Sequence, residues 1–410
     1  MKKIILSMVA VMSIAGSVSA ADTSADSIES ALKDGKFTLD TRVFYYDKDV
    51  DGSSDATTSL TLGSIMKYTT KEYMGLTAGL AYFGSNSIGG LYSKDDGAWT
   101  YSLQSGSGDN INLLGEAYLQ YNISNTMLKI GRQKLSTGVM YGNDLRTLPT
   151  AYEAAILVNK DIPDTKIEVG HVWANSGFTS SYALDGNGVV GFDDSDGLWG
   201  KSGLAYIYVT NNSIDGLSLS AEYIKALSDK TDAGAEATVS SYSYADAAYN
   251  VPIGTNTYIK AQYAGKSYNA SGEDSGQLLG AKIGTSVSIV DLALVADVIS
   301  DNEIYFDMGS PMYTDWQQGY SAYSPSTAFG GYLVVHPMST FSLKGGYVDV
   351  SADNENGSTY ADDYSEINFD AQYKINSISK FRVRYSIKDQ TEESGKADSN
   401  DLRVIYYLSI

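Results

Sequence analysis

Arginine is scarce in this chain and is unevenly placed. Among 410 residues there are six arginines, at Arg42, Arg132, Arg146, Arg382, Arg384 and Arg403. A guanidinium group is always charged, and its planar fork of donors matches a carboxylate or a phosphate. If the fold gathers several of these side chains, they form a surface that attracts anionic groups, even though the formal net charge of the chain is -20.

Lysines and carboxylates occupy similar polar positions near these arginines. The lysines that would extend a basic surface are Lys344, Lys374, Lys380 and Lys388. The carboxylates that could face it are Asp40, Glu116, Glu222, Glu366 and Asp370. Charges of opposite sign across a water-filled passage sort solutes by charge. The alternative is that all of these side chains are solvated and sort nothing.

A second candidate site is an acidic run near the start of the chain. Asp47, Asp49 and Asp51 alternate and are followed by Gly52. Oxygen ligands at alternate positions with glycine at the sixth are typical of the first half of a calcium loop. The bidentate glutamate expected at the twelfth position is replaced by Thr58. The pattern therefore indicates either a calcium site or an ordinary acidic turn.

Residue types that are typical of catalysis are few. The two histidines, His171 and His336, belong to no serine-nucleophile or metal motif. The absence of cysteine excludes disulfides, thiolate zinc sites and a cysteine nucleophile. Strong acidity argues against a nucleic-acid partner. We therefore expect no enzyme activity and no cofactor, apart from the calcium alternative.

The beginning of the chain has the features of an export signal. Two lysines follow Met1, an apolar stretch runs from Ile4 to about Gly16, and Val18-Ser19-Ala20 forms a small-residue cleavage site. We expect residues 1–20 to be removed and residues 21–410 to form a single domain. No later window approaches the length of apolar residues that a membrane-spanning helix needs.

The dominant pattern in the rest of the chain is alternation with a period of two. In one segment Phe381, Val383 and Tyr385 alternate with Arg382 and Arg384. One face of such a strand suits lipid and the other suits water. Strands are predicted at 36–47, 58–70, 73–84, 112–123, 126–135, 152–161, 165–174, 203–211, 216–227, 238–250, 255–267, 276–288, 290–300, 327–336, 339–350, 364–375, 379–389 and 399–410.

The connections between these strands alternate between short and long. Tight turns are predicted at sites such as Ser124-Asn125, Pro163-Asp164 and Pro337-Met338, and longer segments such as 136–151 and 301–326 lie between them. Short periplasmic turns and long outer loops are typical of a transmembrane up-and-down antiparallel β-barrel, here of about 18 strands. A soluble sandwich or β-helix is the alternative, but a chain of this length would usually divide into domains joined by linkers.

Closure of such a barrel would bring the two ends of the chain together. The last strand would pair with the first, so that Arg403, Arg42 and the Arg382/Arg384 pair would lie on three neighbouring strands. By alternation all four side chains would face inward, with Lys344 on a strand farther along the same wall.

Three stretches resemble the OprD family of outer-membrane porins. They are Thr38 to Arg42 with Tyr45-Tyr46, Tyr118 to Lys134, and Asn143 to Pro149, which contains an Asp-x-Arg-x-x-Pro pattern. The resemblance implies an 18-stranded barrel in the bacterial outer membrane whose third outer loop, near 136–151, folds inward as an eyelet. Asp144 and Arg146 would then lie at the constriction and Arg132 would line the pore. Arg42, Arg382, Arg384 and Arg403 would form a basic ladder.

These observations together predict a porin for passive diffusion of small polar solutes, favouring anionic or carboxylate-bearing ones. Its partners would be outer-membrane lipid and such solutes, and it would be a monomer or a homotrimer. The alternative function is a barrel that serves as an adhesin or structural surface protein without an open pore.

Overall fold

A computed structural model describes the chain over residues 24–52, 57–92, 103, 110–141, 146–176, 191–192, 196–253, 256–269, 275–304, 311–318, 325–352, 363–390 and 397–410. The predicted signal peptide, residues 1–20, lies outside these ranges, and its removal stays a prediction. No helix in the described part of the chain is long and apolar enough to cross a membrane.

The described residues form two short helices and a single large sheet. The elements are α1 (Ile28–Lys33), β1 (Lys36–Val50), β2 (Thr57–Thr69), β3 (Leu76–Tyr92), β4 (Ile111–Ile123), β5 (Thr126–Gln133), β6 (Tyr152–Asn159), β7 (Thr165–Asn175), α2 (Asp196–Trp199), β8 (Leu204–Ile214), β9 (Leu217–Ala226), β10 (Val239–Val251), β11 (Asn256–Tyr268), β12 (Gly276–Val287), β13 (Val290–Ser300), β14 (Ser326–Met338), β15 (Phe341–Ala352), β16 (Tyr364–Lys374), β17 (Ser379–Gln390) and β18 (Ser399–Ser409).

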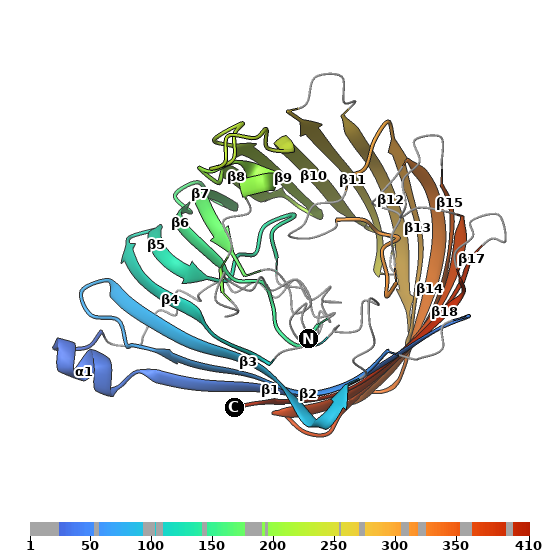
Figure 1. Ribbon diagram of the computed structural model, residues 1–410, viewed down its shortest axis with the longest axis horizontal. Helices are drawn as coiled ribbons and strands as arrows, with labels where there is room; N and C mark the ends of the chain where they lie inside the picture. The colour runs from blue at the N-terminus through green and yellow to red at the C-terminus, as the bar shows by residue number, and fades with distance from the viewer. Residues whose placement is uncertain are drawn as a thin grey trace.

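The sheet has 18 strands and closes on itself (Figure 1). Each strand pairs antiparallel with the next along the chain, and β18 pairs with β1 over the register Asp40 to Ser409 through Val50 to Ser399. A closed sheet has no edge with unpaired backbone groups, which is the condition for strands to cross a membrane. The predicted fold, a closed antiparallel barrel of about 18 strands, is confirmed.

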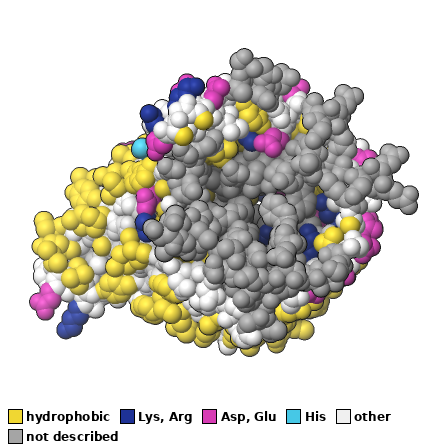
Figure 2. All heavy atoms as spheres, in the orientation of Figure 1, with side chains coloured by type: hydrophobic (Ala, Val, Ile, Leu, Met, Phe, Trp, Pro, Cys, Tyr) yellow, Lys and Arg dark blue, Asp and Glu magenta, His cyan; other side chains and the backbone are white. Residues whose placement is uncertain are grey.

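Alternation divides the side chains of the strands between two surfaces. Outward positions carry large apolar side chains that are well exposed, such as Leu119, Leu279, Leu294 and Phe329. Figure 2 shows hydrophobic side chains gathered over one outer flank of the molecule, where Figure 1 places β4 to β7. In water such a belt would be costly, whereas in a bilayer it is the surface that lipid tails contact.

The buried clusters lie inside the barrel, where inward side chains meet loops. The largest of them contains Leu135, Val139 and Met140 from the connection between β5 and β6, packed with wall residues that include Tyr152 and Tyr242. This connection is the predicted third outer loop. Its burial shows that the loop fills part of the barrel interior instead of extending into solvent.

Two strand predictions differ from the structure in an instructive way. β3 continues to Tyr92, beyond the predicted end at residue 84, because its pairing with β2 continues as far as Ser59 and Tyr92. β14 continues through Pro337 to Met338, so the predicted turn there is wrong and the turn falls at residues 339–340. Proline is tolerated because the pairing with β15 is irregular between Val335 and Met338.

Candidate functional site

The described residues of the third outer loop contact two different parts of the barrel wall. Near its start, the backbone N–H of Val139 donates a hydrogen bond to Glu222 Oε2 on β9 at 3.0 Å. Near its end, Arg42 Nη1 on β1 donates to the carbonyl of Arg146 at 3.0 Å. The buried Glu222 carboxylate accepts from a backbone N–H, and the Arg42 guanidinium donates to a backbone carbonyl. Both contacts hold the main chain of the loop in place. The loop therefore narrows the passage from two sides.

A second loop, between β13 and β14, is also anchored inside. Thr314 donates from its backbone N–H and its hydroxyl to Asp297 Oδ2, at 2.7 and 2.8 Å. The backbone N–H groups of Gln317 and Gln318 donate to Glu366 Oε1 at 3.2 and 3.0 Å. As in the third loop, carboxylates on the wall accept main-chain hydrogen bonds from a loop. This segment, residues 311–318, forms a second inward element.

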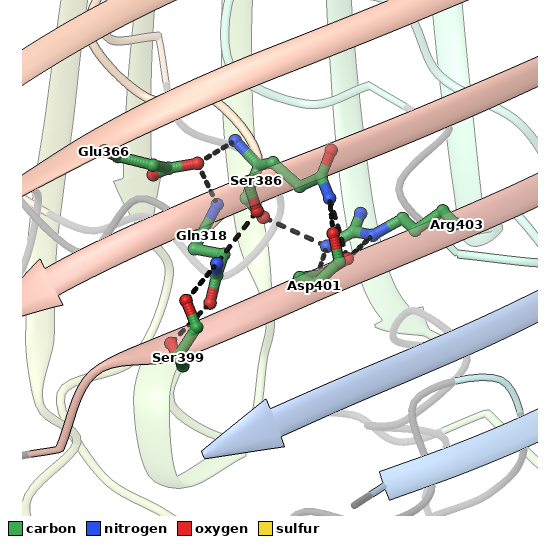
Figure 3. A network of polar contacts seen from close by, with 7 residues as sticks. Gln318, Glu366, Ser386, Ser399, Asp401 and Arg403 are labelled. Atoms are coloured by element: carbon green, nitrogen blue, oxygen red, sulfur yellow. Dashed lines mark hydrogen bonds and ion pairs between the residues drawn. The ribbon is translucent and has the colours of Figure 1, made fainter. Parts of the chain in front are cut away.

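Arg403 fastens this second loop to the wall (Figure 3). Its guanidinium makes two hydrogen bonds to Asp401, from Nε to Oδ1 at 2.8 Å and from Nη2 to Oδ2 at 2.7 Å. Nη2 also donates to the carbonyl of Gln317 at 3.0 Å, and Gln317 Nε2 donates to Asp401 Oδ1 at 2.7 Å. Both charged side chains are 2% exposed. Arg403 thus lies beneath the loop, away from the open passage.

Other basic residues of the predicted ladder lie on the inner wall nearby. Arg382 Nη2 and Asp370 Oδ2 form an ion pair at 2.5 Å, and Arg384 Nε lies 3.8 Å from the same oxygen. Arg42 lies over the ring of Tyr407, 5.2 Å from its centroid. One carboxylate thus faces two guanidinium groups on this part of the wall.

The basic surface continues along β11 to β15 as lysines interleaved with aromatic rings. Lys260 and Lys282 lie over Tyr258 at 5.8 and 6.0 Å. Lys282 and Lys344 lie over Tyr332 at 5.0 and 4.3 Å. We call the set formed by Lys260, Lys282, Lys344, Arg382, Arg384 and Arg42 the basic track.

The rings beside these lysines remain neutral. Trp316 of the second inward loop lies 5.3 Å from Lys344. Tyr313 of the same loop lies 5.8 Å from Lys282. Burial, followed by the charge of Asp246, raises the pKa of the Tyr313 hydroxyl, so the phenol stays uncharged. The lysine charges therefore remain uncompensated by these rings.

One predicted pore-lining residue is placed elsewhere by the structure. Arg132 shares the outer face of β5 with Leu128 and Ile130, which are about half exposed, whereas Gln133 next to it is fully buried on the inner face. The guanidinium forms an ion pair with Glu153 Oε1 at 2.7 Å. The prediction that Arg132 lines the pore is therefore wrong, because alternation places it on the outer surface.

Other predicted residues are only partly described. Asp144 lies outside the described residues, so its place at the constriction stays a prediction. Asp47 of the acidic run accepts a hydrogen bond from Thr58 Oγ1 at 2.7 Å. Within the described residues, no three His, Asp or Glu side chains gather in a group that could hold a metal ion. Residues 53–56 lie outside those ranges, so the calcium alternative also stays a prediction.

The two histidines make contacts that indicate fixed positions on the barrel. His171 Nε2 lies 2.9 Å from the carbonyl of Ser202, and His336 Nε2 lies 2.8 Å from Asp291 Oδ2. Neither of these two partner atoms is a serine hydroxyl, so the contacts provide no support for nucleophilic catalysis.

Several residues of the site were missed at the sequence level. Lys260 and Lys282 alternate with Ile259 and Ile283 inside predicted strands, so the alternation could have found them. Gln317 carried no such signal, because it lies in a loop whose contacts depend on the register of distant strands. Three of the carboxylates expected as an acidic lining hold loops or cations: Glu222 and Glu366 bind loop N–H groups, and Glu116 Oε2 pairs with Lys67 at 2.5 Å.

Comparison with known proteins fits this architecture. Residues 30–185 match a family model described as outer membrane porin, OprD family. The resemblance to OprD-family porins is confirmed. The matched part of this OprD-like barrel includes β1 to β7 and the third loop. No curated protein sequence matches the chain.

Solved porins of Pseudomonas aeruginosa have the same fold as this OprD-like barrel. OccK1 (OpdK) has a TM-score of 0.75 at 14% identity, over 92% of this chain and 99% of that one. OccK9 (OpdG) has a TM-score of 0.75 at 16% identity, over 93% and 99%. OccD3 (OpdP) has a TM-score of 0.72 at 16% identity, over 93% and 92%. The family match and the membrane-spanning barrel identify a bacterial outer-membrane protein.

Proposed function

We propose that this protein is a passive outer-membrane channel for small polar solutes and that it favours solutes carrying a carboxylate. The observation that carries the proposal is the basic track, which lines one inner wall beside two inward loops. A passive channel needs no reacting group, so we expect no enzyme activity and no resident cofactor. The family match also favours a channel over the alternative of an adhesin or structural surface barrel.

The size of the expected charge effect follows from elementary electrostatics. A unit charge about 5 Å from a passing carboxylate contributes about 0.8 kcal/mol even at the dielectric constant of water. That energy corresponds to about a fourfold increase in local anion concentration for each cation. Low-dielectric walls strengthen the effect, whereas salt at about 0.1 M largely screens charges that are more than about 10 Å apart. A track of several cations is therefore sufficient to make the channel favour anions.

The interleaved aromatic rings suggest a finer preference. Tyr332 lies between Lys282 and Lys344, and Trp316 lies beside Lys344. A flat aromatic solute could stack on such rings while its carboxylate meets a lysine. One of the structurally similar proteins, OpdK, was solved with vanillate. We therefore include aromatic carboxylates among the solutes that this channel would pass.

The proposal is tested by measuring ion selectivity in planar lipid bilayers. The double substitution K282Q/K344Q removes two charges of the basic track, and we expect the ratio of anion to cation permeability to fall by about fourfold or more for each charge removed. Lys225→Gln is the matched control, because Lys225 lies on the outer face of β9 next to the exposed Tyr223. If both variants kept the wild-type reversal potential, the basic track would have no sorting role.

The oligomeric state and calcium binding are two further proposals. We propose that the barrel is a monomer or a homotrimer, which analytical ultracentrifugation in density-matched detergent would distinguish. A calcium ion at Asp47, Asp49 and Asp51 would be detected by titration of the purified protein. A surface adhesin without a pore would show no single-channel conductance in the bilayer measurement.

A further inference from the structure

The first described element, α1, is a short helix outside the sheet. It begins after Ser27, whose hydroxyl accepts a hydrogen bond from the backbone N–H of Ser30 at 3.1 Å. In return, Ser30 Oγ accepts a hydrogen bond from the backbone N–H of Ser27 at 3.0 Å. This reciprocal capping fixes the start of the helix. The helix is therefore a defined structure and not an extension of β1.

α1 is attached to the barrel at the end that carries the short turns. The backbone N–H of Lys71, in the turn between β2 and β3, donates to the carbonyl of Ala31 at 3.0 Å. The backbone N–H of Ala25 donates to the carbonyl of Glu72 in the same turn at 2.7 Å. Ala25 and Ala31 are both buried by this contact. Short turns lie on the periplasmic side of a barrel of this kind, so α1 lies at the periplasmic rim.

The contacts of α1 also place it on the outer side of the wall. Tyr68 alternates with Lys67, which is directed into the barrel, where it pairs with Glu116. The Tyr68 ring therefore points outward, and its hydroxyl donates to the carbonyl of Leu32. Figure 1 shows α1 at the outer margin of the ring, beside the first residues of β1.

The exposed surface of α1 is divided into an apolar and a polar side. Ile28 and Leu32 are four residues apart, so they lie on one face of the helix next to the buried Ala31. They are 67% and 57% exposed. Glu29 and Lys33 lie on the other side of the helix. This division is typical of a helix that lies in the plane of a membrane interface.

The apolar side of α1 is continuous with the lipid-facing surface of the barrel. Phe37, at the start of β1, pairs with the outward Tyr68 and is 60% exposed. Met74, in the turn that holds α1, is 73% exposed. Leu76 begins β3 on the outer face and is about half exposed. Exposed apolar side chains therefore occur both on the helix and at the strand ends that border it.

We propose that α1 is a membrane-interface anchor whose Ile28 and Leu32 side chains insert into the periplasmic leaflet of the outer membrane. The occupant of this surface is phospholipid, because the surface continues one that a membrane barrel already presents to lipid. The anchor rests on the proposed function to the extent that it requires the barrel to span a membrane. The anchor sets how deeply the periplasmic rim lies in the membrane. It thereby sets the position of β1 along the membrane normal, and Arg42 on β1 holds the third loop.

The absence of cysteine from the chain allows a direct test by fluorescence quenching. Four variants each carry one bimane-labelled cysteine on α1: Ile28→Cys, Leu32→Cys, Glu29→Cys and Lys33→Cys. A fifth label, at Leu119→Cys on the outer face of β4, marks the lipid-facing wall. The full-length barrel is placed in phospholipid nanodiscs, one copy per disc, with either ordinary or brominated acyl chains, and iodide is the quencher in water.

We expect brominated lipid to quench the labels at residues 28 and 32 several-fold more than those at residues 29 and 33, with iodide giving the reverse order. The proposal is overturned if all four α1 labels respond to iodide alone while the Leu119→Cys label is still quenched by brominated lipid. It is also overturned if protection at residues 28 and 32 requires two copies per disc, because the occupant would then be a second chain. Failure of quenching at Leu119→Cys as well would overturn the membrane barrel itself.

Discussion

Asp401→Asn tests how the second inward loop is held. In the wild type, Asp401 neutralises Arg403, and both side chains are 2% exposed. The substitution keeps the shape of the side chain but leaves a buried guanidinium without its counter-charge. Breaking a buried ion pair by removing one partner costs about 3–5 kcal/mol. The backbone pairing of the 18 strands does not depend on this side chain, whereas Arg403 and Asp401 both contact Gln317. We therefore expect the cost to fall mainly on the docking of residues 311–318.

The expected consequence is a passage that is wider and less steady. A loss of about 3 kcal/mol changes the ratio of docked to undocked loop by more than a hundredfold. We expect larger mean single-channel conductance and increased open-channel noise in planar bilayers. Replacing both partners, Asp401→Leu with Arg403→Met, removes the unpaired charge, and we expect this double variant to be more stable to urea than Asp401→Asn alone.

Asp370→Asn is the matched control for this experiment. It also removes a carboxylate from an ion pair on the inner wall, here with Arg382, and this pair joins two neighbouring strands of the wall. It should increase anion selectivity without raising conductance noise. Equal noise in Asp401→Asn and wild type, with intact folding shown by heat-modified gel mobility, would refute the assignment of Arg403 and Asp401 as the fastening of the loop.

Three further predictions, each with its control, concern the basic track, the third loop and the acidic run. Arg384→Gln should lower anion selectivity by about fourfold. Arg132→Gln should leave the selectivity unchanged, because Arg132 lies on the outer face. Reversal potentials measured in a salt gradient compare the two variants with the wild type. Gly138→Val should displace the third loop and raise conductance, because an added Cβ would lie 2.5 Å from the ring of Tyr244. Gly345→Val is its control, because no atom of the described residues lies within 4 Å of the added Cβ. Calcium should raise the melting temperature only if Asp47, Asp49 and Asp51 bind it, and Asp49→Asn should then abolish the shift.

The strands of this protein could be predicted from sequence because their signal is local. Alternation with a period of two is imposed by the contrast between lipid and water across the wall, and it is complete within a few residues. The same local signal correctly places Arg42, Arg382 and Arg384 on the inner face. It also explains the error at Arg132, whose neighbours Leu128 and Ile130 mark the outer face of β5.

The loops could not be predicted because their contacts depend on the register of the whole ring. Val139 meets Glu222 across 83 positions of sequence, and Gln317 meets Asp401 across 84. No local pattern relates such residues. A carboxylate such as Glu366 appears from sequence to be part of a charged lining, yet its oxygen is used by the N–H groups of Gln317 and Gln318. Only the closed sheet brings them together.

The zero-current potential of the wild-type protein, measured across a planar bilayer with unequal potassium chloride concentrations, addresses the main conclusion most directly. An open channel lined by the basic track should give stepwise conductance and a potential whose sign corresponds to preferential chloride passage. A potential of the opposite sign, or a bilayer that stays silent after verified insertion, would contradict it.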